Sequence, residues 1–353
     1  MSHQSPERAL ERLLDDGRVR AARTGAAQTR LWEALTEATR GGKRFRPALL
    51  MAAHRAFAGE RAAAGQHAAA AVAAAIELLH TAFVVHDDVI DGDDVRRGRL
   101  NVSGTYDAEA LAAGASVDQA RELGRAAGIL AGDLALATAV RAVATCGADP
   151  EVVERLLDLV DAALHTTACG ELADVAQSLR LGTTTLADTL RMEEQKTSAY
   201  SFSLPLQAGA LLAGADAAAV DRLGEAGRRL GLAFQLLDDL LGVFGDPVVT
   251  GKSATSDLRA AKQTPLLVHA ATTSEWRRLR ELVGRELSAT GLAEAQQLLT
   301  ASGSRRFVED RAASEMAAAR QILEELGIAD DLLAAVAAAL PEATFIKEKE
   351  AVA

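Results

Sequence analysis

The stretch AAAAVAAAIELLHTAFVVHDDVID, residues 68–91, joins a long apolar run to an acidic end. Alanine and leucine are strong helix formers, and residues 68–85 contain no proline or glycine to interrupt a helix. Nearly half of that run is alanine, and Glu77 and His80 lie within it, so it would insert poorly into a membrane. The stretch therefore predicts a long helix buried in a protein core.

The rest of the chain has the same helical character. Its 353 residues are 49% hydrophobic but only 3% aromatic, so the core must consist mainly of Ala, Leu and Val. The chain has only 7 prolines, and alternating β-branched runs bounded by turn residues are nearly absent. We therefore predict an all-α fold, with long helices of the kind found in large bundles.

Charge and cysteine content restrict the possible partners and compartment. The 38 Lys and Arg are outnumbered by 49 Asp and Glu, giving a formal net charge of −11, which disfavours non-specific nucleic-acid binding. Cys146 and Cys169 lack a metal-type spacing and fit a reducing cytoplasm. The N-terminus has no apolar run of signal-peptide length. We expect a cytoplasmic protein with no nucleic-acid partner and no transmembrane segment.

Three aspartates end the first apolar run. On a helix Asp87 and Asp91 share one face, and Asp88 lies about 100° around the axis. Like charges at this spacing repel each other, and the apolar residues before them indicate burial, so the cluster needs a cation. An ordinary charged helix end is the alternative.

A second acidic pair lies in FQLLDDLLGVF, residues 234–244, where Asp238 and Asp239 have apolar neighbours on both sides. Burying two carboxylates without a positive partner is costly. Carboxylates are the ligands that Mg²⁺ prefers, usually one or two together with substrate phosphate oxygens. A structural pair bonded to arginine is the alternative. The two clusters together predict a polynuclear Mg²⁺ site for a diphosphate.

Basic residues gather near both clusters. The segment GGKRFRP, residues 41–47, has three cations beside two glycines. This pattern is typical of a turn that binds an anion. Arginine binds phosphate oxygens bidentately, and lysine acts as a point charge. Randomly scattered surface charges are the alternative. The other candidate cations are Arg96, Arg97, Arg99, Lys196, Lys252 and Lys262.

With these motifs the chain resembles the trans-isoprenyl diphosphate synthases (polyprenyl synthetases), which include farnesyl and geranylgeranyl diphosphate synthases. The motifs follow the family order between Gly41 and about Leu267: GGKRFRP, ELLHTAFVVHDDVID, DDVRRGR, AGDLALA, GELADV, KTSAYSF, FQLLDD and GKSATSDLRAAKQT. The resemblance implies a single-domain isoprenoid-synthase helical bundle around a central cavity. The polyprenyl synthetase domain is expected at residues 31–342. The charged residues 1–30 are expected to form a helical or flexible segment, and the polar residues 343–353 a tail.

The resemblance also implies the chemistry: condensation of isopentenyl diphosphate with an allylic diphosphate held by three Mg²⁺ ions. The implied direct metal ligands are Asp87, Asp91 and Asp238, with Asp88 and Asp239 as ligands or supporting partners. The positions matching contacts to isopentenyl diphosphate are Lys43, Arg46, His80 and Arg97. The positions matching the allylic diphosphate site are Arg96, Lys196, Thr197, Gln235, Lys252 and Lys262. The polar segment 245–257, which carries Lys252, is expected to act as a lid.

Product length is expected to depend on side chains about one helical turn before the first aspartate. Phe83 and Ala82 lie four and five residues before Asp87, and a phenylalanine there can act as the floor of a product tunnel. This predicts a C20 geranylgeranyl product, with C15 farnesyl as the next choice. If Phe83 only packs the core, longer products are possible.

Three positions depart from the family pattern. Gly242 stands at the fifth position of the second aspartate motif, Leu100 stands where the RRGxP motif has proline, and Glu171 replaces the commoner glutamine. A non-catalytic partner subunit is therefore one alternative. A class I terpene cyclase is a weaker one, because its second metal motif begins with asparagine and Asn101 is the sole asparagine here. A homodimer is expected by resemblance.

Overall fold

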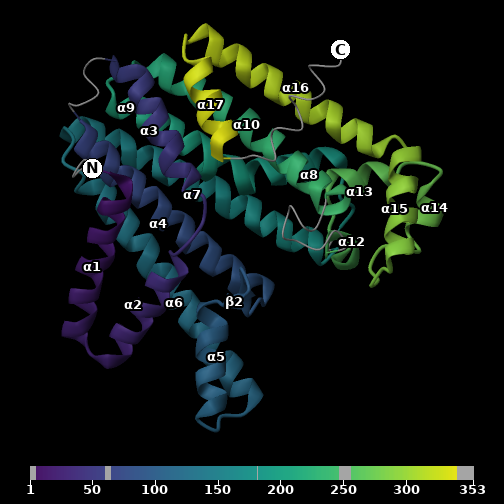
Figure 1. Ribbon diagram of the computed structural model, residues 1–353, viewed down its shortest axis with the longest axis horizontal. Coiled ribbons are helices and arrows are strands. Elements are labelled where there is room, and N and C mark those ends of the chain that lie inside the picture. The colour runs from purple at the N-terminus through teal and green to yellow at the C-terminus, as the bar shows by residue number, and fades with distance from the viewer. Residues whose placement is uncertain (1–4, 60–64, 181, 246–255, 340–353) are drawn as a thin grey trace. The chain divides into compact units, whose positions relative to one another are not determined.

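The computed structural model describes residues 5–59, 65–180, 182–245 and 256–339, and this part of the chain is almost entirely helical, which confirms the all-α prediction (Figure 1). The first elements are α1 (Pro6–Thr24), α2 (Ala26–Ala38), α3 (Phe45–Ala58), α4 (Gln66–Asp91), β1 (Val95–Arg96), β2 (Arg99–Leu100), α5 (Val102–Ala112), α6 (Val117–Ala144) and α7 (Pro150–Ser178). The others are α8 (Leu186–Glu193), the π-helix η2 (Glu194–Ser203), α9 (Leu204–Leu212), α10 (Ala217–Phe244), α12 (Ser256–Ala260), α13 (Pro265–Ala270), α14 (Trp276–Leu279), α15 (Ala289–Ala301), α16 (Ser304–Glu325) and α17 (Ala329–Ala339).

The chain forms two compact units. The first contains residues 1–160 and 208–216, and the second contains residues 161–207 and 217–353. The boundaries therefore fall inside α7, inside α9 and just before α10. The tail predicted at 343–353 lies outside the described residues, as do residues 246–255 of the predicted lid.

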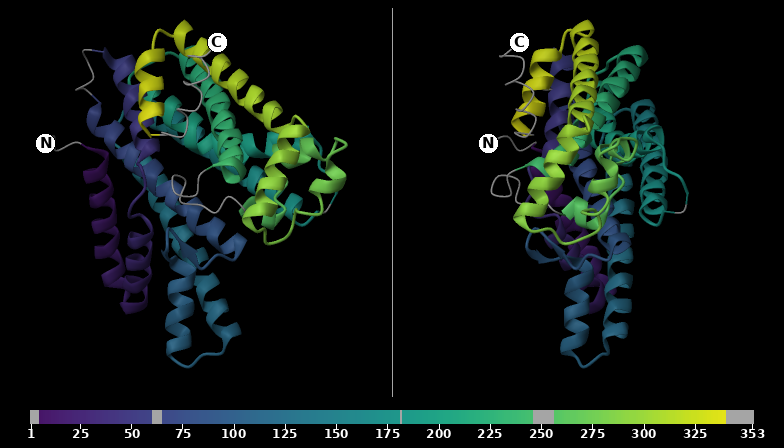
Figure 2. Two further views of the ribbon diagram at one scale, coloured as in Figure 1. Left: turned by 45° about the vertical axis from the view of Figure 1, so that its right-hand side comes forward. Right: turned by 90° about the vertical axis from the view of Figure 1, so that its right-hand side faces the viewer.

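In the first unit, α4 packs against α1, α3 and α6, and α5 lies beside α6 (Figure 2). The alanines of α4 other than Ala71 are buried, as are Ile76, Leu78 and Leu79. Both α4 and α6 are long and apolar enough to cross a membrane, but 78% of the most apolar window of α4 is buried within the protein, against 50% for α6. The helix predicted from residues 68–91 is thus a core helix.

Glycine allows α6 to approach α4 closely. A Cβ atom on Gly132 would lie 2.1 Å from Nε2 of His86 on α4, and one on Gly128 would lie 2.3 Å from a methyl group of Val89. Such separations are far below a van der Waals contact, so larger residues at either position would push the helices apart. This contact holds the end of α4 that carries the aspartates.

A short antiparallel hairpin follows α4 and turns the chain back beside it. Its strands pair Val95 with Leu100 and Arg96 with Arg99. Both loop residues have positive φ, 53° at Arg97 and 73° at Gly98, the conformation required by the tight two-residue turns that join antiparallel strands. The hairpin therefore sets the positions of two candidate phosphate-binding arginines, Arg96 and Arg97.

In the second unit, α10 packs along α16 and against η2. A ten-residue π-helix is unusual, because most π-helical segments are single turns inside α-helices and are often found at functional sites. The contact of α10 with η2 depends on glycine: a Cβ atom on Gly231 would lie 2.4 Å from Oγ of Ser198. The core of this unit includes Leu236 and Leu240 of α10, Leu266 of α13 and Leu299 of α15.

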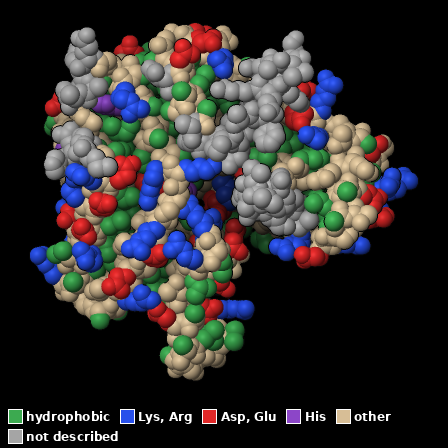
Figure 3. All heavy atoms as spheres, viewed as in Figure 1, with side chains coloured by type: hydrophobic (Ala, Val, Ile, Leu, Met, Phe, Trp, Pro, Cys, Tyr) green, Lys and Arg blue, Asp and Glu red, His purple; other side chains and the backbone are tan. Residues whose placement is uncertain are grey.

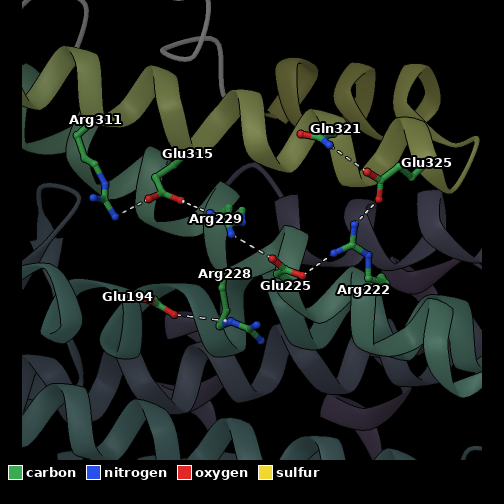
Figure 4. Close-up of polar contacts among 9 residues, drawn as sticks. All are labelled: Glu194, Arg222, Glu225, Arg228, Arg229, Arg311, Glu315, Gln321 and Glu325. Atoms are coloured by element: carbon green, nitrogen blue, oxygen red, sulfur yellow. Dashed lines mark hydrogen bonds and ion pairs between the residues drawn. The ribbon is translucent and has the colours of Figure 1, made fainter.

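A network of ion pairs joins α10 to α16 and η2 (Figure 4). Arg229 contacts Glu225 at 3.1 Å and Glu315 at 3.2 Å, and Arg311 contacts the other oxygen of Glu315 at 2.6 Å. Most of these side chains are partly exposed, so each pair adds little stability alone, and the network mainly fixes geometry. The connected residues are Arg222, Glu225, Arg229, Arg311, Glu315 and Glu325, and Arg228 forms a separate pair with Glu194 of η2.

Candidate active site

The first acidic cluster lies at the C-terminal end of α4. Asp87 and Asp91 are four residues apart and therefore share a face of the helix. The Asp87 side chain is 26% exposed, and Asp91 is exposed. The helix stops immediately after Asp91, where Gly92 adopts a left-handed conformation with φ 71°. Both carboxylates are therefore accessible to a ligand at the helix end.

Asp88 differs from its neighbours because it is buried. Its residue is 3% exposed, and its Oδ1 accepts a hydrogen bond of 2.6 Å from Nε of Arg96. Nη2 of Arg96 also reaches Oδ2 of Asp87 at 3.2 Å. Burial raises the pKa of Asp88, and the charge of Arg96 opposes that rise. Asp88 thus holds Arg96 against Asp87.

Candidate phosphate-binding cations surround His80. Burial lowers the pKa of His80 well below its ordinary value, and the nearby charges of Arg46, Arg97, Arg96 and Arg44 lower it further. The imidazole is therefore neutral at pH 7, able to donate one hydrogen bond and accept another. A cavity of ≈ 750 Å³ is lined by His80, Asp88, Arg96 and Arg97 among other residues of this unit. Lys and Arg side chains also gather on this face of the first unit (Figure 3).

The GGKRFRP segment forms a turn in which three residues have positive φ. Gly41 and Gly42 have φ of 82° and 80°. A Cβ atom on either glycine would lie 3.1–3.2 Å from the guanidinium of Arg97, so glycine leaves room for that side chain. Arg44 has φ 50° and points inward, donating to Glu77 at 2.7 Å and to the carbonyl of Thr39 at 2.6 Å.

Arg44 is therefore a structural residue. Its ion pair with Glu77 is largely buried, since the two side chains are 27% and 8% exposed. The motif's other two cations, Lys43 and Arg46, remain candidates for binding phosphate. The motif by itself does not separate the roles of its three cations, whereas the family resemblance selected Lys43 and Arg46 and left out Arg44.

The second acidic pair lies near the C-terminal end of α10. Asp239 is 2% exposed and Asp238 is half-buried, which matches the burial predicted from the apolar sequence around them. Nε2 of Gln235 donates to Oδ1 of Asp239 at 3.1 Å, and Oγ1 of Thr197 donates to Oε1 of Gln235 at 3.1 Å. Three predicted site residues from η2 and α10 are thus joined in one chain of hydrogen bonds.

Glu193 is a partner of this cluster that sequence reasoning missed. Its pKa is raised well above the ordinary value, first by burial, then by the charge of Asp239 and by a hydrogen bond with that residue. Lys262 opposes the rise and Asp174 adds to it, so both lie near the cluster. A neutral Glu193 can donate a hydrogen bond to the carboxylate of Asp239. No local pattern indicated this role, since MEEQKT is typical of an ordinary polar turn of helix.

Lys196 is bound by two carboxylates of α7. Its Nζ lies 2.7 Å from Oδ2 of Asp174, and 3.1 Å and 3.0 Å from the two carboxylate oxygens of Glu171. Gly170 brings α7 against η2, because a Cβ atom there would lie 2.3 Å from the backbone nitrogen of Lys196. Lys252, predicted to belong to the same substrate site, lies outside the described residues.

Comparison with known proteins places the chain in a family. The sequence profile of the polyprenyl synthetases matches residues 28–299. The chain is a member of the polyprenyl synthetase family. A (2E,6E)-farnesyl diphosphate synthase of Mycobacterium tuberculosis is 35% identical over 59% of this chain and 58% of its own length. A geranylfarnesyl diphosphate synthase of Aeropyrum pernix is 37% identical over 41% of this chain and 45% of its own length. The matches thus span about half the length of these relatives.

A solved structure resembles this polyprenyl synthetase over nearly its whole length. It is a geranylgeranyl pyrophosphate synthase of Corynebacterium glutamicum, complexed with isoprenyl diphosphate and magnesium. The TM-score is 0.84 at 30% identity, covering 96% of this chain and 97% of the other. The family resemblance inferred from the motifs is therefore confirmed, and so is the isoprenoid-synthase fold. The roles assigned to single residues remain predictions.

The side chains of this polyprenyl synthetase fit a magnesium site that is completed by substrate. Asp87 and Asp91 offer carboxylate oxygens on one helix face, with Arg96 beside them. Within the described ranges, no group of three or more His, Cys, Asp or Glu side chains could hold a metal alone. Mg²⁺ in phosphate-binding enzymes typically takes one or two carboxylates together with substrate phosphate oxygens and water. The donor set fits that mode of binding.

Proposed function

We propose that this chain is a Mg²⁺-dependent prenyltransferase that condenses isopentenyl diphosphate with an allylic diphosphate to an all-trans prenyl diphosphate. The observation that carries the proposal is the end of α4. There Asp87 and Asp91 share an accessible face, and the buried Asp88 holds Arg96 beside them. Carboxylates for a metal and an arginine for phosphate thus occur at one helix end. The family, and the related synthase complexed with magnesium, support the same reading.

In this proposal the chain's own residues bind the two diphosphates. Arg46 and Arg97, with the neutral His80 and Lys43, hold isopentenyl diphosphate. Arg96 and Lys196 contact the allylic diphosphate, together with Lys252, Lys262, Thr197 and Gln235. The proposed metal ligands are Asp87, Asp91 and Asp238, supported by Asp88 and Asp239. Three bound Mg²⁺ ions would stabilise the negative charge that develops on the departing pyrophosphate.

The reaction proposed here needs no protein nucleophile. The carbon–oxygen bond at C1 of the allylic substrate breaks, and pyrophosphate leaves with the bonding electrons. The double bond of isopentenyl diphosphate then attacks C1, and the pyrophosphate takes the proton that is lost. The pocket must exclude water, because water would capture the allylic cation. The apolar residues of α4 before Asp87 provide the kind of surface that this requires.

We propose a C20 geranylgeranyl product, with C15 farnesyl as the next choice. Phe83 lies four residues before Asp87, on the same face of α4, and is half-buried, whereas Ala82 is 1% exposed. Phe83 is therefore the first large side chain below the proposed metal ligands on that face. A growing chain that runs along this face would meet its ring.

We also propose a cytoplasmic homodimer. Leu123, Ile129 and Leu130 of α6 are 47%, 46% and 54% exposed, and only 50% of the most apolar window of this helix is buried. An exposed apolar helix face of this kind is typical of a surface that a second copy covers. Light scattering on the purified protein should give the mass of two chains, and the mass of one chain would reject the dimer.

A product assay tests the proposed function. Purified protein is given Mg²⁺, labelled isopentenyl diphosphate and, separately, C5, C10 and C15 allylic diphosphates. We expect a C20 or C15 product that is lost in Asp87→Ala and lengthened in Phe83→Ala. Glu122→Ala is the matched control, because Glu122 is an exposed acidic residue of α6 in the same unit.

The main alternative is a non-catalytic partner subunit, which the Gly242 departure favours. Absence of product from every starter with a folded wild-type protein would support that alternative. Product of unchanged length from Phe83→Ala would show that Phe83 only packs the core.

A further inference from the structure

Lys196 is held by more negative charge than it can balance. Asp174 contacts its ammonium at 2.7 Å, and Glu171 contacts it with both carboxylate oxygens at 3.0 and 3.1 Å. All three side chains are partly exposed, with 25% exposure for Lys196 and 20% for each acid. The group of three carries a net charge of −1 at neutral pH. A net negative charge is unexpected around a lysine that is proposed to bind a diphosphate.

The backbone keeps the lysine in this position. Gly170 brings α7 so close to η2 that a Cβ atom would lie 2.3 Å from the nitrogen of Lys196 and 2.7 Å from the carbonyl carbon of Gln195. Glu171 and Asp174 follow Gly170 at one and four residues, so both extend from the same short part of α7. The two acids therefore meet the ammonium through a tightly packed helix contact.

Glu171 and Asp174 are not equivalent partners. Asp174 makes the shorter contact, whereas Glu171 adds a second negative charge to an ammonium that already has a carboxylate partner. A glutamine at 171 could still accept a hydrogen bond from Lys196 through its amide oxygen, but it would carry no charge. The charge of Glu171 is thus separable from its ability to hold the lysine in place.

We propose that Glu171 is a positioning residue that competes with diphosphate for Lys196 and so weakens the retention of pyrophosphate. This inference rests on the proposed function, in which Lys196 contacts the allylic diphosphate. The incoming diphosphate displaces Glu171 from the ammonium while Asp174 keeps its contact. When pyrophosphate is ready to leave, the carboxylate of Glu171 takes its place again. Release of pyrophosphate is thereby favoured, and the affinity for the allylic diphosphate is lowered.

The test is the binding of inorganic pyrophosphate in the presence of Mg²⁺, measured by titration calorimetry on the full chain. Glu171→Gln should bind pyrophosphate about fivefold more tightly than wild type, the size expected for one partly exposed charge. The KM for the allylic diphosphate should fall by a similar factor, with little change in the KM for isopentenyl diphosphate. Asp161→Asn is the matched control, since its side chain lies on the same helix and is 73% exposed.

A double-mutant cycle with Lys196→Gln separates competition for the lysine from a merely structural role. In the Lys196→Gln background, Glu171→Gln should no longer tighten the binding of pyrophosphate. Unchanged or weaker binding by Glu171→Gln, or equal tightening in both backgrounds, would overturn the inference. Failure of the wild-type protein itself to bind pyrophosphate with Mg²⁺ would instead reject the proposed function, and this inference with it.

Discussion

The two helices that end in aspartates, α4 of the first unit and α10 of the second, stabilise their carboxylates differently. In α4 the buried Asp88 is bonded to a charged partner, Arg96, which the adjacent hairpin supplies. In α10 the buried Asp239 is bonded to the amide of Gln235 and to Glu193. Asp88 therefore contacts a guanidinium, whereas Asp239 accepts a hydrogen bond from an amide.

This difference shows that an aspartate pair in a sequence does not define its own environment. The α4 pair is followed within eight residues of Asp88 by the arginine that pairs with it, so its ion pair is local. Asp239 is bonded to Gln235 within α10 and to Glu193 at the end of α8, more than forty residues earlier in the chain. The first cluster can thus be interpreted from one short segment of sequence, and the second requires the fold.

The largest expected effect on activity comes from removing one buried charge from each helix. Asp88→Asn leaves Arg96 without its main anionic partner, and we expect the unfolding free energy to fall by about 1–2 kcal/mol, because Arg96 is partly exposed. Asp239→Asn removes a buried charge but keeps a hydrogen-bond acceptor for Gln235. Its unfolding free energy should stay level or rise by up to about 1 kcal/mol. Both variants should lose about tenfold or more in prenyl transfer.

Chemical denaturation and the product assay measure both effects in the same preparations. Equal destabilisation by the two substitutions would contradict the contrast between the charge-paired and the hydrogen-bonded aspartate.

The glycine contacts beside the two helices offer a second comparison. Gly231→Ala would press a Cβ atom against the side chain and backbone of Ser198, with the nearest atoms at 2.4–2.6 Å. Gly132→Ala would meet the imidazole of His86, which can rotate. We expect a loss of about 2–3 kcal/mol for the first and about 1–2 kcal/mol for the second.

Unfolding in urea measures these losses, and Gly25→Ala is unsuitable as a control because of its positive φ of 139°. Gly182→Ala serves instead, since a Cβ atom there would meet nothing within 4 Å. A greater loss at position 132 than at 231 would reject the proposed order.

The smallest effect is expected at Gly242, where α10 lacks the acid that α4 has at the equivalent position. Gly242→Asp would place a carboxylate four residues after Asp238, on the same helix face, and so reproduce the Asp87–Asp91 spacing. We expect the half-saturating Mg²⁺ concentration of the product assay to fall by about threefold or less, because Asp238 already offers a ligand.

Gly242→Ala is the control for the change in helix propensity. A gain in rate above about tenfold for Gly242→Asp alone would mean that Gly242 limits metal binding in the wild-type protein.

Much of the fold could be predicted from local patterns. The alanine-rich run of α4, the glycine after Asp91 and the scarcity of proline all act over a few residues, so the sequence displays them directly. The motifs with their cations likewise indicated the family. Burial of Asp239 was predicted as well, because its apolar neighbours are adjacent in the chain.

What the sequence could not predict depends on contacts between distant segments. Arg44 turns inward because Glu77 and the carbonyl of Thr39 are there to receive it, and no local pattern distinguishes it from Lys43. Glu193 becomes a partner of Asp239 only through the packing of α10 on the preceding helices. The ion pairs of Lys196 with Glu171 and Asp174 likewise require α7 to lie against η2.

The π-helix η2 has a consequence for how the chain can vary. Each residue of an α-helix advances about 100° around the axis, so a segment with wider turns changes the rotational phase of everything after it. Loss of one residue between Glu194 and Ser203 could return this segment to α-helical winding at little cost in local stability. It would also rotate Lys196 and Thr197 relative to the helix that follows. Insertions and deletions should therefore be rare between Glu194 and Ser203 in related chains, even at positions where the side chain varies.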